Sequence, residues 1–251
     1  WELFCWQGYI RWLSEQHKKV IILSRSGHQF LYEDFADEYY EFNSMTEKGV
    51  TWQGQHNNNK LNKLKNNLDF DWYIPPFNLG YGTNKNGKLD ILKDTFYQQK
   101  FIKYRSNTID KYYDIIIHPR NKQIGNNRNW KREKWQKLVN MLVERNIRIA
   151  IIGTNESFNL KNAFDYRNIP IKDTVALFNR CKLVVGPSSG PMHLASLSGT
   201  PHLVWSNKKN RIRYMKHWNP FKTPVYFYDK ENWNPSVENI YNEIIKILNY
   251  G

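Results

Sequence analysis

Short apolar runs and helical stripes alternate along the second half of the chain. The runs are five to seven residues long, which suits strands that a sheet buries on both faces. We expect strands at 114–118, 147–153, 182–186, 201–205 and 224–228. Helical spacing between the runs predicts helices over 131–145 and 173–180, after Gly190, and from Ser236 onward. Strands that alternate with helices predict a parallel, doubly wound sheet, so the fold class is α/β.

The first half of the chain has a weaker pattern. We expect a helix over 3–13, a strand at 20–24, and helices over 29–37 and 89–103. This repeats the strand and helix alternation of the second half in a less regular form. The sequence therefore predicts two Rossmann-like domains that face a cleft, residues 1–105 and residues 106–251.

The chain is strongly basic, with a formal net charge of +14 at pH 7. Such a balance indicates an acidic partner: a nucleic acid, an anionic membrane surface or a phosphate-bearing ligand. Lysine and asparagine are abundant along the whole chain, however, which equally fits a compositional bias, and a nucleic-acid module would concentrate its charge on one face. No apolar run approaches the ~18 residues of a membrane-spanning helix. The two cysteines make no disulfide framework, so we expect a cytoplasmic protein.

Three loops follow the ends of predicted strands, and parallel strands bring such loops to one edge of the sheet. The most informative loop is GPSSGPMH, in which Ser188, Ser189 and Gly190 are small enough for a ligand to approach the backbone. Pro191 fits the first turn of a helix. The free N–H groups and the positive dipole end at that turn suit a phosphate. The alternative is an ordinary strand-to-helix turn, with His193 as a core histidine.

Basic residues crowd the loop after the first of these strands, and some of them could bind a diphosphate, because guanidinium grips phosphate bidentately. They are Arg120, Lys122, Arg128, Lys131 and Arg132. A solvated basic loop is the other interpretation. Glu156, just past Gly153, could accept hydrogen bonds from ribose hydroxyls or could simply stabilise a helix start. The histidines are scattered, without metal-ligand spacing, and neither G-x-G-x-x-G nor a P-loop is present, so neither a metal nor a cofactor is expected.

These segments together resemble glycosyltransferase family 9, the heptosyltransferase-like enzymes. The resemblance covers residues 114–206, and its most specific part is SSGPMHLA followed by GTP. It departs from the family pattern at three positions: Ser188 stands for an aspartate, Arg120 for a glycine and Lys131 for a proline. The resemblance implies a GT-B fold whose second domain binds a nucleotide sugar.

The resemblance also implies roles for individual residues. Ser189 to His193 would form the diphosphate-binding turn, Arg128 would take the place of a phosphate-binding lysine, and Glu156 that of a ribose-binding glutamate. The full set expected at the donor site is His118, Arg120, Arg128, Gly153, Glu156, Ser188, Ser189, Gly190, Pro191, Met192 and His193.

The catalytic base is expected in the first domain, where the resemblance implies an acid after the first strand. Glu2 takes that position by analogy, and Asp34, Asp37 and Glu38 are the next candidates. The family's first strand and glycine-rich loop have no counterpart before Glu2. The first domain is therefore expected to lack its first strand, or the chain to be a trimmed form of the protein.

The leading hypothesis is an inverting, metal-independent glycosyltransferase that moves a sugar from a nucleoside diphosphate to a hydroxyl of a glycan or glycolipid. A GT-B fucosyltransferase using GDP-fucose is an alternative, because some of these enzymes also carry an arginine shortly after a histidine, as His118-Pro119-Arg120 does. A non-catalytic protein that binds nucleic acid or an anionic surface is the third possibility. We expect a nucleotide sugar and a glycan or glycolipid as partners, with peripheral contact to an anionic membrane left open and nucleic acid disfavoured.

Overall fold

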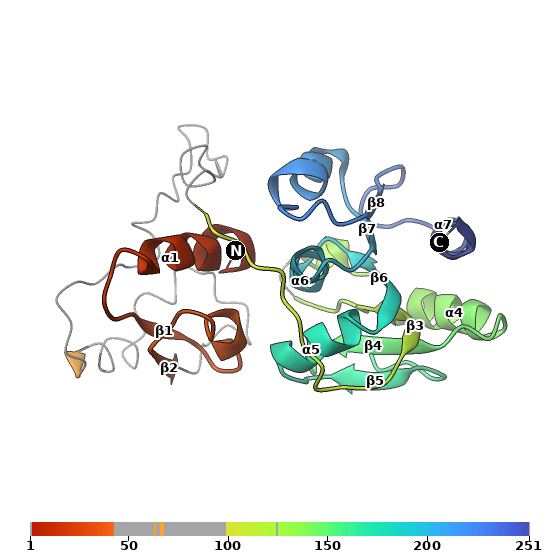
Figure 1. Cartoon of the computed structure of the whole chain (residues 1–251). Coiled ribbons are helices and arrows are strands. Elements are labelled where there is room, and N and C mark those ends of the chain that lie inside the picture. The colour runs from red at the N-terminus through yellow and green to blue at the C-terminus, as the bar shows by residue number, and fades with distance from the viewer. Residues whose placement is uncertain (1, 43–62, 64–65, 68–98, 124, 251) are drawn as a thin grey trace. The chain divides into compact units, whose positions relative to one another are not determined.

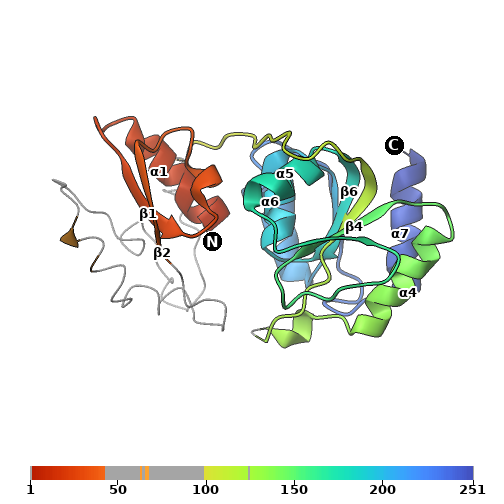
Figure 2. The same cartoon turned by 90° about the horizontal axis from the view of Figure 1, so that it is seen from below.

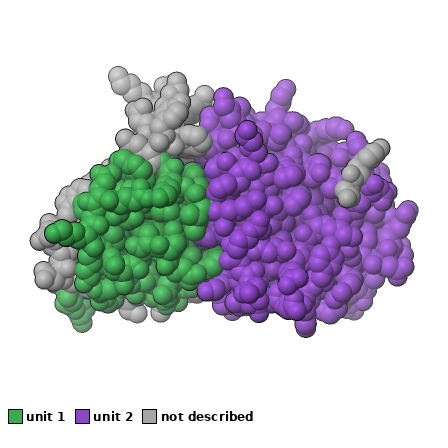
Figure 3. Space-filling view, in the orientation of Figure 1, with its two compact units in different colours: residues 1–102 green, residues 103–251 purple. Residues whose placement is uncertain are grey.

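The protein folds as two compact units, residues 1–102 and 103–251 (Figure 3). The computed structural model describes residues 2–42, 63, 66–67, 99–123 and 125–250. The division lies just before the expected domain boundary at 105/106, and the roles expected for the two halves stay predictions. No helix in the described part of the chain is long and apolar enough to cross a membrane.

Unit 2 is built on a six-stranded parallel sheet with the order β5-β4-β3-β6-β7-β8 (Figure 1). Its strands are β3 (Tyr113–Ile117), β4 (Ile149–Gly153), β5 (Phe164–Arg167), β6 (Cys181–Pro187), β7 (His202–Trp205) and β8 (Val225–Tyr228). From β3 the chain first builds outward to β4 and β5, then returns to the other side of β3 with β6 and continues outward to β8. The order therefore reverses between β3 and β6, which is the point where open α/β sheets bind their ligands.

Helices cover both faces of this sheet. The helices are α4 (Arg132–Val143), α5 (Ile171–Phe178), α6 (Gly190–Ser198) and α7 (Val237–Tyr250). α5 and α6 lie on one face, and α4 and α7 lie on the other (Figure 2). Because side chains alternate along a strand, Ile115 and Ile117 face α4 and α7, while Ile116 between them is buried under the opposite layer.

Three tryptophans anchor the layer under α4. The rings of Trp130, Trp135 and Trp205 lie within 5.4 Å of one another, centroid to centroid, and all three are fully buried. Aromatic pairs at such separations add to the stabilisation from buried area. The cluster joins the end of β7 to the start of α4, and so fixes where the loop between β3 and α4 ends.

The predicted strands and helices of the second half are confirmed within a few residues, but one strand was missed. β5 has the sequence FDYR, with a mostly exposed pattern at the sheet edge, so no apolar run marks it. It pairs with β4, and the rings of Phe164 and Tyr166 pack on Tyr113. Asn168 closes the end of that strand by donating its backbone N–H to the carbonyl of Gly153 at 2.6 Å.

In unit 1 a helical segment precedes two parallel strands. One π-type turn, η1 (Glu2–Trp6), leads into α1 (Gln7–Ser14), and β1 (Ile21–Arg25) pairs with β2 (Glu38–Phe42). The helix expected over 29–37 is wrong: the segment forms only a 3₁₀ turn, η2 (Gln29–Leu31). The helix expected over 89–103 lies largely outside the described residues, and residues 99–103 have no helical structure.

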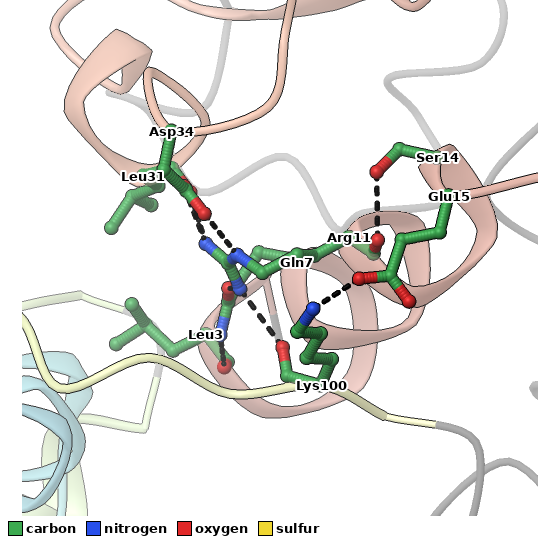
Figure 4. A network of polar contacts seen from close by, with 8 residues as sticks. All are labelled: Leu3, Gln7, Arg11, Ser14, Glu15, Leu31, Asp34 and Lys100. Carbon is green, nitrogen blue, oxygen red and sulfur yellow. Dashed lines mark hydrogen bonds and ion pairs between the residues drawn. The ribbon is translucent and has the colours of Figure 1, made fainter. Parts of the chain in front are cut away.

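A buried arginine holds unit 1 together (Figure 4). Arg11 on α1 is 3% exposed and forms a two-pronged ion pair with Asp34, at 2.6 and 3.0 Å. The same guanidinium donates to the carbonyl oxygens of Leu31 and Lys100, both at 3.0 Å. One cation thus links α1 to the segment after η2 and to residue 100, and a buried charge with this many partners is costly to remove.

Burial of His202 makes the stability of the fold depend on pH. His202 on β7 is fully buried, and its Nδ1–H donates to the carbonyl of Thr200 at 3.0 Å. Its Nε2 has no partner among the described residues, so protonation would bury an N–H without an acceptor. Burial accordingly lowers the pKa of His202 from 6.5 to about 4. Above pH 6.5 the ring is neutral in both the folded and the unfolded chain, so it does not reduce the free energy of unfolding. As the pH falls from 6.5 toward 4, the unfolded chain binds a proton that the folded chain does not, and the free energy of unfolding decreases.

We predict that His202→Gln reduces the dependence of the unfolding free energy on pH in the acidic range. Urea titrations at successive pH values should show the wild-type unfolding free energy falling between pH 6.5 and 4. In the variant the slope should be smaller by up to about 1.4 kcal/mol per pH unit, the limit for one proton. His217→Gln, which replaces a partly exposed histidine and keeps His202, is the matched control. Equal slopes in wild type and His202→Gln would contradict the assignment.

Candidate functional site

The loops after β3 and β6 begin side by side at the switch point of the sheet. Ile117 and Val185 are paired neighbours at the ends of these strands, and the backbone N–H of His118 donates to the carbonyl of Val185 at 2.9 Å. The His118 ring then bridges the two loops, with Nδ1 3.0 Å from the Ser189 hydroxyl. Burial lowers the pKa of His118 to about 3, so the ring is neutral at pH 7 and orients Ser189 without adding charge.

The turn after β6 presents the open start of α6. Ser189 has an extended backbone at the N-cap position, and its side chain makes no capping hydrogen bond to the helix, because its hydroxyl is bonded to His118. Pro191 lies in the first turn. Gly190 is exposed, and a Cβ built on it meets nothing within 4 Å. The helix N-terminus is thus positively polarised and accessible to an anion.

Tyr214 supports this turn from behind, and the sequence analysis did not select it. It lies in η8 (Arg213–His217), and its hydroxyl donates to the Ser188 oxygen at 2.9 Å. The Tyr214 ring stacks on the His193 ring with centroids 4.6 Å apart. Burial raises the pKa of Tyr214, so the phenol stays protonated and remains a donor. The available signal was the aromatic and basic segment RYMKHW, which follows β7 at the same sheet edge.

Arg120 is a buried cation in the loop after β3. Its side chain is folded inward, with the residue 3% exposed. Nη1 donates to the carbonyl of Gly125 at 3.0 Å and to the side-chain oxygen of Asn129. Burial, and then the nearby charge of Arg128, lower the pKa of Arg120 to about 10, while Glu156 raises it. The guanidinium therefore remains charged at neutral pH.

Arg128 is a second cation in the loop after β3. It ends the short turn η6 (Asn126–Arg128), which starts from Gly125 in the left-handed region at φ 64°. Its guanidinium lies over the Trp233 ring, 5.3 Å from the centroid. Burial lowers its pKa and Tyr214 raises it, so Arg128 lies within electrostatic reach of the residue that supports the Ser188 turn.

The loop after β4 joins the first loop through its backbone. Gly153 has φ 141°, and a Cβ there would lie 2.2 Å from the Ser157 hydroxyl and 3.3 Å from the His118 ring, so this position requires glycine. The carbonyl of Glu156 accepts a hydrogen bond from Asn121 at 2.9 Å. The Glu156 side chain is exposed and influences Arg120 electrostatically. The structure thus gathers three predicted loops at one edge.

Not every predicted site residue lies open to a ligand. Met192 is fully buried, and its Cε would lie 3.3 Å from a Cβ added to Gly186, so its side chain belongs to the core. Glu2 opens η1, but its side chain lies outside the described residues. Its role as the base stays a prediction.

The other acids considered for the base are already engaged within unit 1. Asp34 is paired with Arg11, Asp37 accepts the backbone N–H of Val20 at 2.7 Å, and Glu38 is bonded to Lys19 and Tyr40. These contacts favour structural roles for all three.

The family model for glycosyltransferase family 9 (heptosyltransferase) matches residues 85–204. The matched segment makes up just under half of the chain, and it spans β3 to β7 with both loops at the switch point. The chain is a glycosyltransferase that is similar to this family. None of the curated proteins matches the chain.

Two solved structures show a fold similar to that of this chain. The glycosyl transferase family 9 from Veillonella parvula DSM 2008 has a TM-score of 0.60 at 10% identity, covering 98% of this chain and 95% of that one. The ADP-heptose LPS heptosyltransferase II of E. coli has a TM-score of 0.57 at 11% identity, covering 97% and 94%. The expected GT-B fold is confirmed, although unit 1 shows only part of its domain within the described residues.

We predict that Gly125→Ala disturbs Arg128. A Cβ at Gly125 would lie 2.7 Å from Nη2 of Arg128, in a backbone with φ 64°. The variant should lose about 1–2 kcal/mol of stability through the left-handed conformation, and its affinity for nucleoside diphosphates should fall as Arg128 is displaced. Isothermal titration calorimetry measures the second effect.

Gly27→Ala is the control for backbone strain. Gly27 has φ 75°, but a Cβ there meets nothing within 4 Å. This variant should lose comparable stability and keep its nucleotide affinity. If both variants bind nucleoside diphosphates like the wild type, Arg128 does not contribute to the site.

Proposed function

We propose that the chain transfers a sugar from a nucleoside-diphosphate donor to a hydroxyl of a glycan or glycolipid, with inversion and without a metal ion. One observation carries the proposal: the loop after β3, which contains Arg120 and Arg128, begins at His118, and the His118 ring contacts Ser189 at the open N-terminus of α6, at the switch point of the sheet. Three sources of positive potential converge where such sheets bind ligands.

The electrostatics of the two arginines support an anionic donor. The charge of Arg128 lowers the pKa of Arg120, which means that the two cations repel each other. A diphosphate near this loop would relieve that repulsion, and it could accept charge-assisted hydrogen bonds from Arg128, while buried Arg120 would act on it through its charge. When the bond to the sugar breaks, negative charge grows on the departing diphosphate, and fixed cations and helix N–H groups stabilise it without reorganising.

The remaining donor contacts follow from the same arrangement. The backbone from Ser188 to Gly190 would face the diphosphate, His118 would hold the Ser189 hydroxyl in position, and exposed Glu156 would accept from ribose hydroxyls. Tyr214 keeps the Ser188 turn in place by its hydrogen bond of 2.9 Å. In this proposal the arginines and α6 do the work that a metal ion does in metal-dependent transferases.

The acceptor hydroxyl needs a base, and we assign that role to Glu2. An inverting transfer removes the proton as the hydroxyl attacks, so a carboxylate must come within ~2.6–3.2 Å of it, or reach it through one water. Support comes from the other three acids considered for this role, because Asp34, Asp37 and Glu38 are held by partners. We place the reaction in the cytoplasm, with a glycan or glycolipid as the acceptor.

Arg128→Ala tests the donor site directly. The loss of hydrogen bonds from a charged group should weaken nucleoside-diphosphate binding by ~1.5–3 kcal/mol. Arg132→Ala is the matched control, because Arg132 is exposed and donates to the carbonyl of Asn159 at 3.2 Å. The readout is a thermal-shift titration with ADP, GDP, UDP and CDP, in which a ligand at about 100 times its dissociation constant stabilises by about 2.7 kcal/mol.

The same titration separates the alternatives. Preference for GDP would favour the fucosyltransferase interpretation over the use of an adenosine donor. No stabilisation by any nucleoside diphosphate, together with salt-dependent binding of RNA or DNA, would favour a non-catalytic binder. Equal affinities of wild type and Arg128→Ala for every nucleotide would place the donor elsewhere.

Glu2→Gln tests the base. If Glu2 removes the proton, sugar transfer should fall ~100-fold or more, while donor binding stays unchanged. Glu15→Gln serves as the control, since Glu15 is an exposed acid paired with Lys100 on the surface. Near-normal turnover by Glu2→Gln in a transfer assay with the identified donor would remove Glu2 from the mechanism.

A further inference from the structure

The segment between β7 and β8 has two chemically different sides. It contains two short helical turns, η7 (Lys208–Asn210) and η8 (Arg213–His217) (Figure 1). Its inner side is aromatic: Tyr214 and Trp218 are buried and pack on His193. These contacts fix the segment on the body of unit 2, so its outer side has a defined surface.

The outer side combines cations with exposed aliphatic side chains. Ile212 is 53% exposed and Met215 is 52% exposed, and both are flanked by exposed lysines: Lys208, Lys209 and Lys216. Within the described residues these lysines form no ion pair, whereas neighbouring Arg211 is neutralised by Asp229 at 3.0 Å. We call Lys208, Lys209, Ile212, Met215 and Lys216 the outer patch.

The patch lies in a stretch that is free of acidic residues. No aspartate or glutamate occurs between Asp173 and Asp229, while the segment from Lys208 to Lys222 contains six lysines and arginines. This is the longest stretch of the chain without an acidic residue. The match to glycosyltransferase family 9 ends at residue 204, so the patch is a feature of this chain outside the matched segment.

We propose that the outer patch docks on the surface of an anionic lipid bilayer. Lysines next to such a surface are attracted to its negative potential, and Ile212 and Met215 would insert among the headgroups, where their apolar surface leaves water. A nucleic acid would use the cations but would leave these two aliphatic side chains in water. The combination of lysines with exposed isoleucine and methionine therefore favours a bilayer.

The outer patch lies at the same edge of the sheet as the proposed donor site. Pro187 and Trp205 are paired neighbours at the ends of β6 and β7, so the Ser188 turn and the outer patch leave adjacent strands at the same edge. Tyr214 contacts Ser188 from the inner side of the segment whose outer side carries the patch. The inference goes beyond the proposed function and does not depend on it, because vesicle binding requires no donor.

Vesicle flotation of the full chain tests the proposal. The protein should float with vesicles of phosphatidylcholine mixed with phosphatidylglycerol, should not float with phosphatidylcholine alone, and should be released by salt. The triple variant Lys208→Glu, Lys209→Glu, Lys216→Glu should lose about tenfold or more in vesicle affinity. Its thermal shift with nucleoside diphosphates should stay like that of the wild type, which separates this result from the proposed function.

Matched variants separate the patch from the total charge. Lys111→Glu, Lys161→Glu, Lys246→Glu makes the same change in net charge at exposed lysines on other elements, and should bind anionic vesicles much more tightly than the patch variant. Ile212→Ser, Met215→Ser should weaken binding to anionic vesicles with little change in its salt dependence. The counterpart Tyr112→Ser, Phe164→Ser alters two other exposed apolar residues and should bind like the wild type.

Three results would overturn the proposal. The first is equal vesicle binding by the two triple variants, which would make the effect one of bulk charge. The second is equal flotation of the wild type with neutral and anionic vesicles. The third is wild-type vesicle binding by the patch variant together with loss of its binding to single-stranded RNA, which would make the patch a nucleic-acid surface.

Discussion

The parallel pairing of β3 with β6 is the constraint on which the rest of unit 2 depends. It joins strands that are distant in sequence, so that His118 and Ser189, 71 positions apart, come within 3.0 Å. The pairing of β3 with β6 is also the point where the order of the strands in the sheet reverses. Because both strands are buried on both faces, their register is fixed by packing on each side. The loops that carry the site therefore start from rigid positions.

Burial of cations is the second organising feature of the molecule. Arg11 in unit 1 and Arg120 in unit 2 are both 3% exposed, yet they serve different ends. Arg11 is neutralised by Asp34 and by carbonyl oxygens, which makes it a structural element. Arg120 is held by a carbonyl and an amide oxygen and lies beside a second arginine. Its hydrogen-bond partners are uncharged, so they leave its positive charge uncompensated, whereas the carboxylate of Asp34 compensates that of Arg11.

Tyr214 connects the parts of the site that the sequence keeps apart. It holds Ser188 through one hydrogen bond and His193 through ring stacking. Its own position depends on the turns between β7 and β8, where the outward residues are lysine, isoleucine and methionine. A single buried phenol therefore ties the proposed nucleotide turn to the proposed membrane patch, although each is argued from separate observations.

The sequence by itself determined the parallel sheet and the three loops at its edge. Runs such as DIIIH and KLVVG are apolar enough to specify buried strands, and the small residues before Pro191 mark the helix start. Tertiary structure decided what local patterns do not encode. β5 has no apolar run of its own, and it forms where it can pair with the edge of β4. Residues 29–37 form only a short turn, in which Leu31 and Asp34 bind the distant Arg11. Whether an arginine is solvated or buried likewise depends on distant partners: only the folded chain shows Arg120 buried in its loop and Tyr214 behind Ser188.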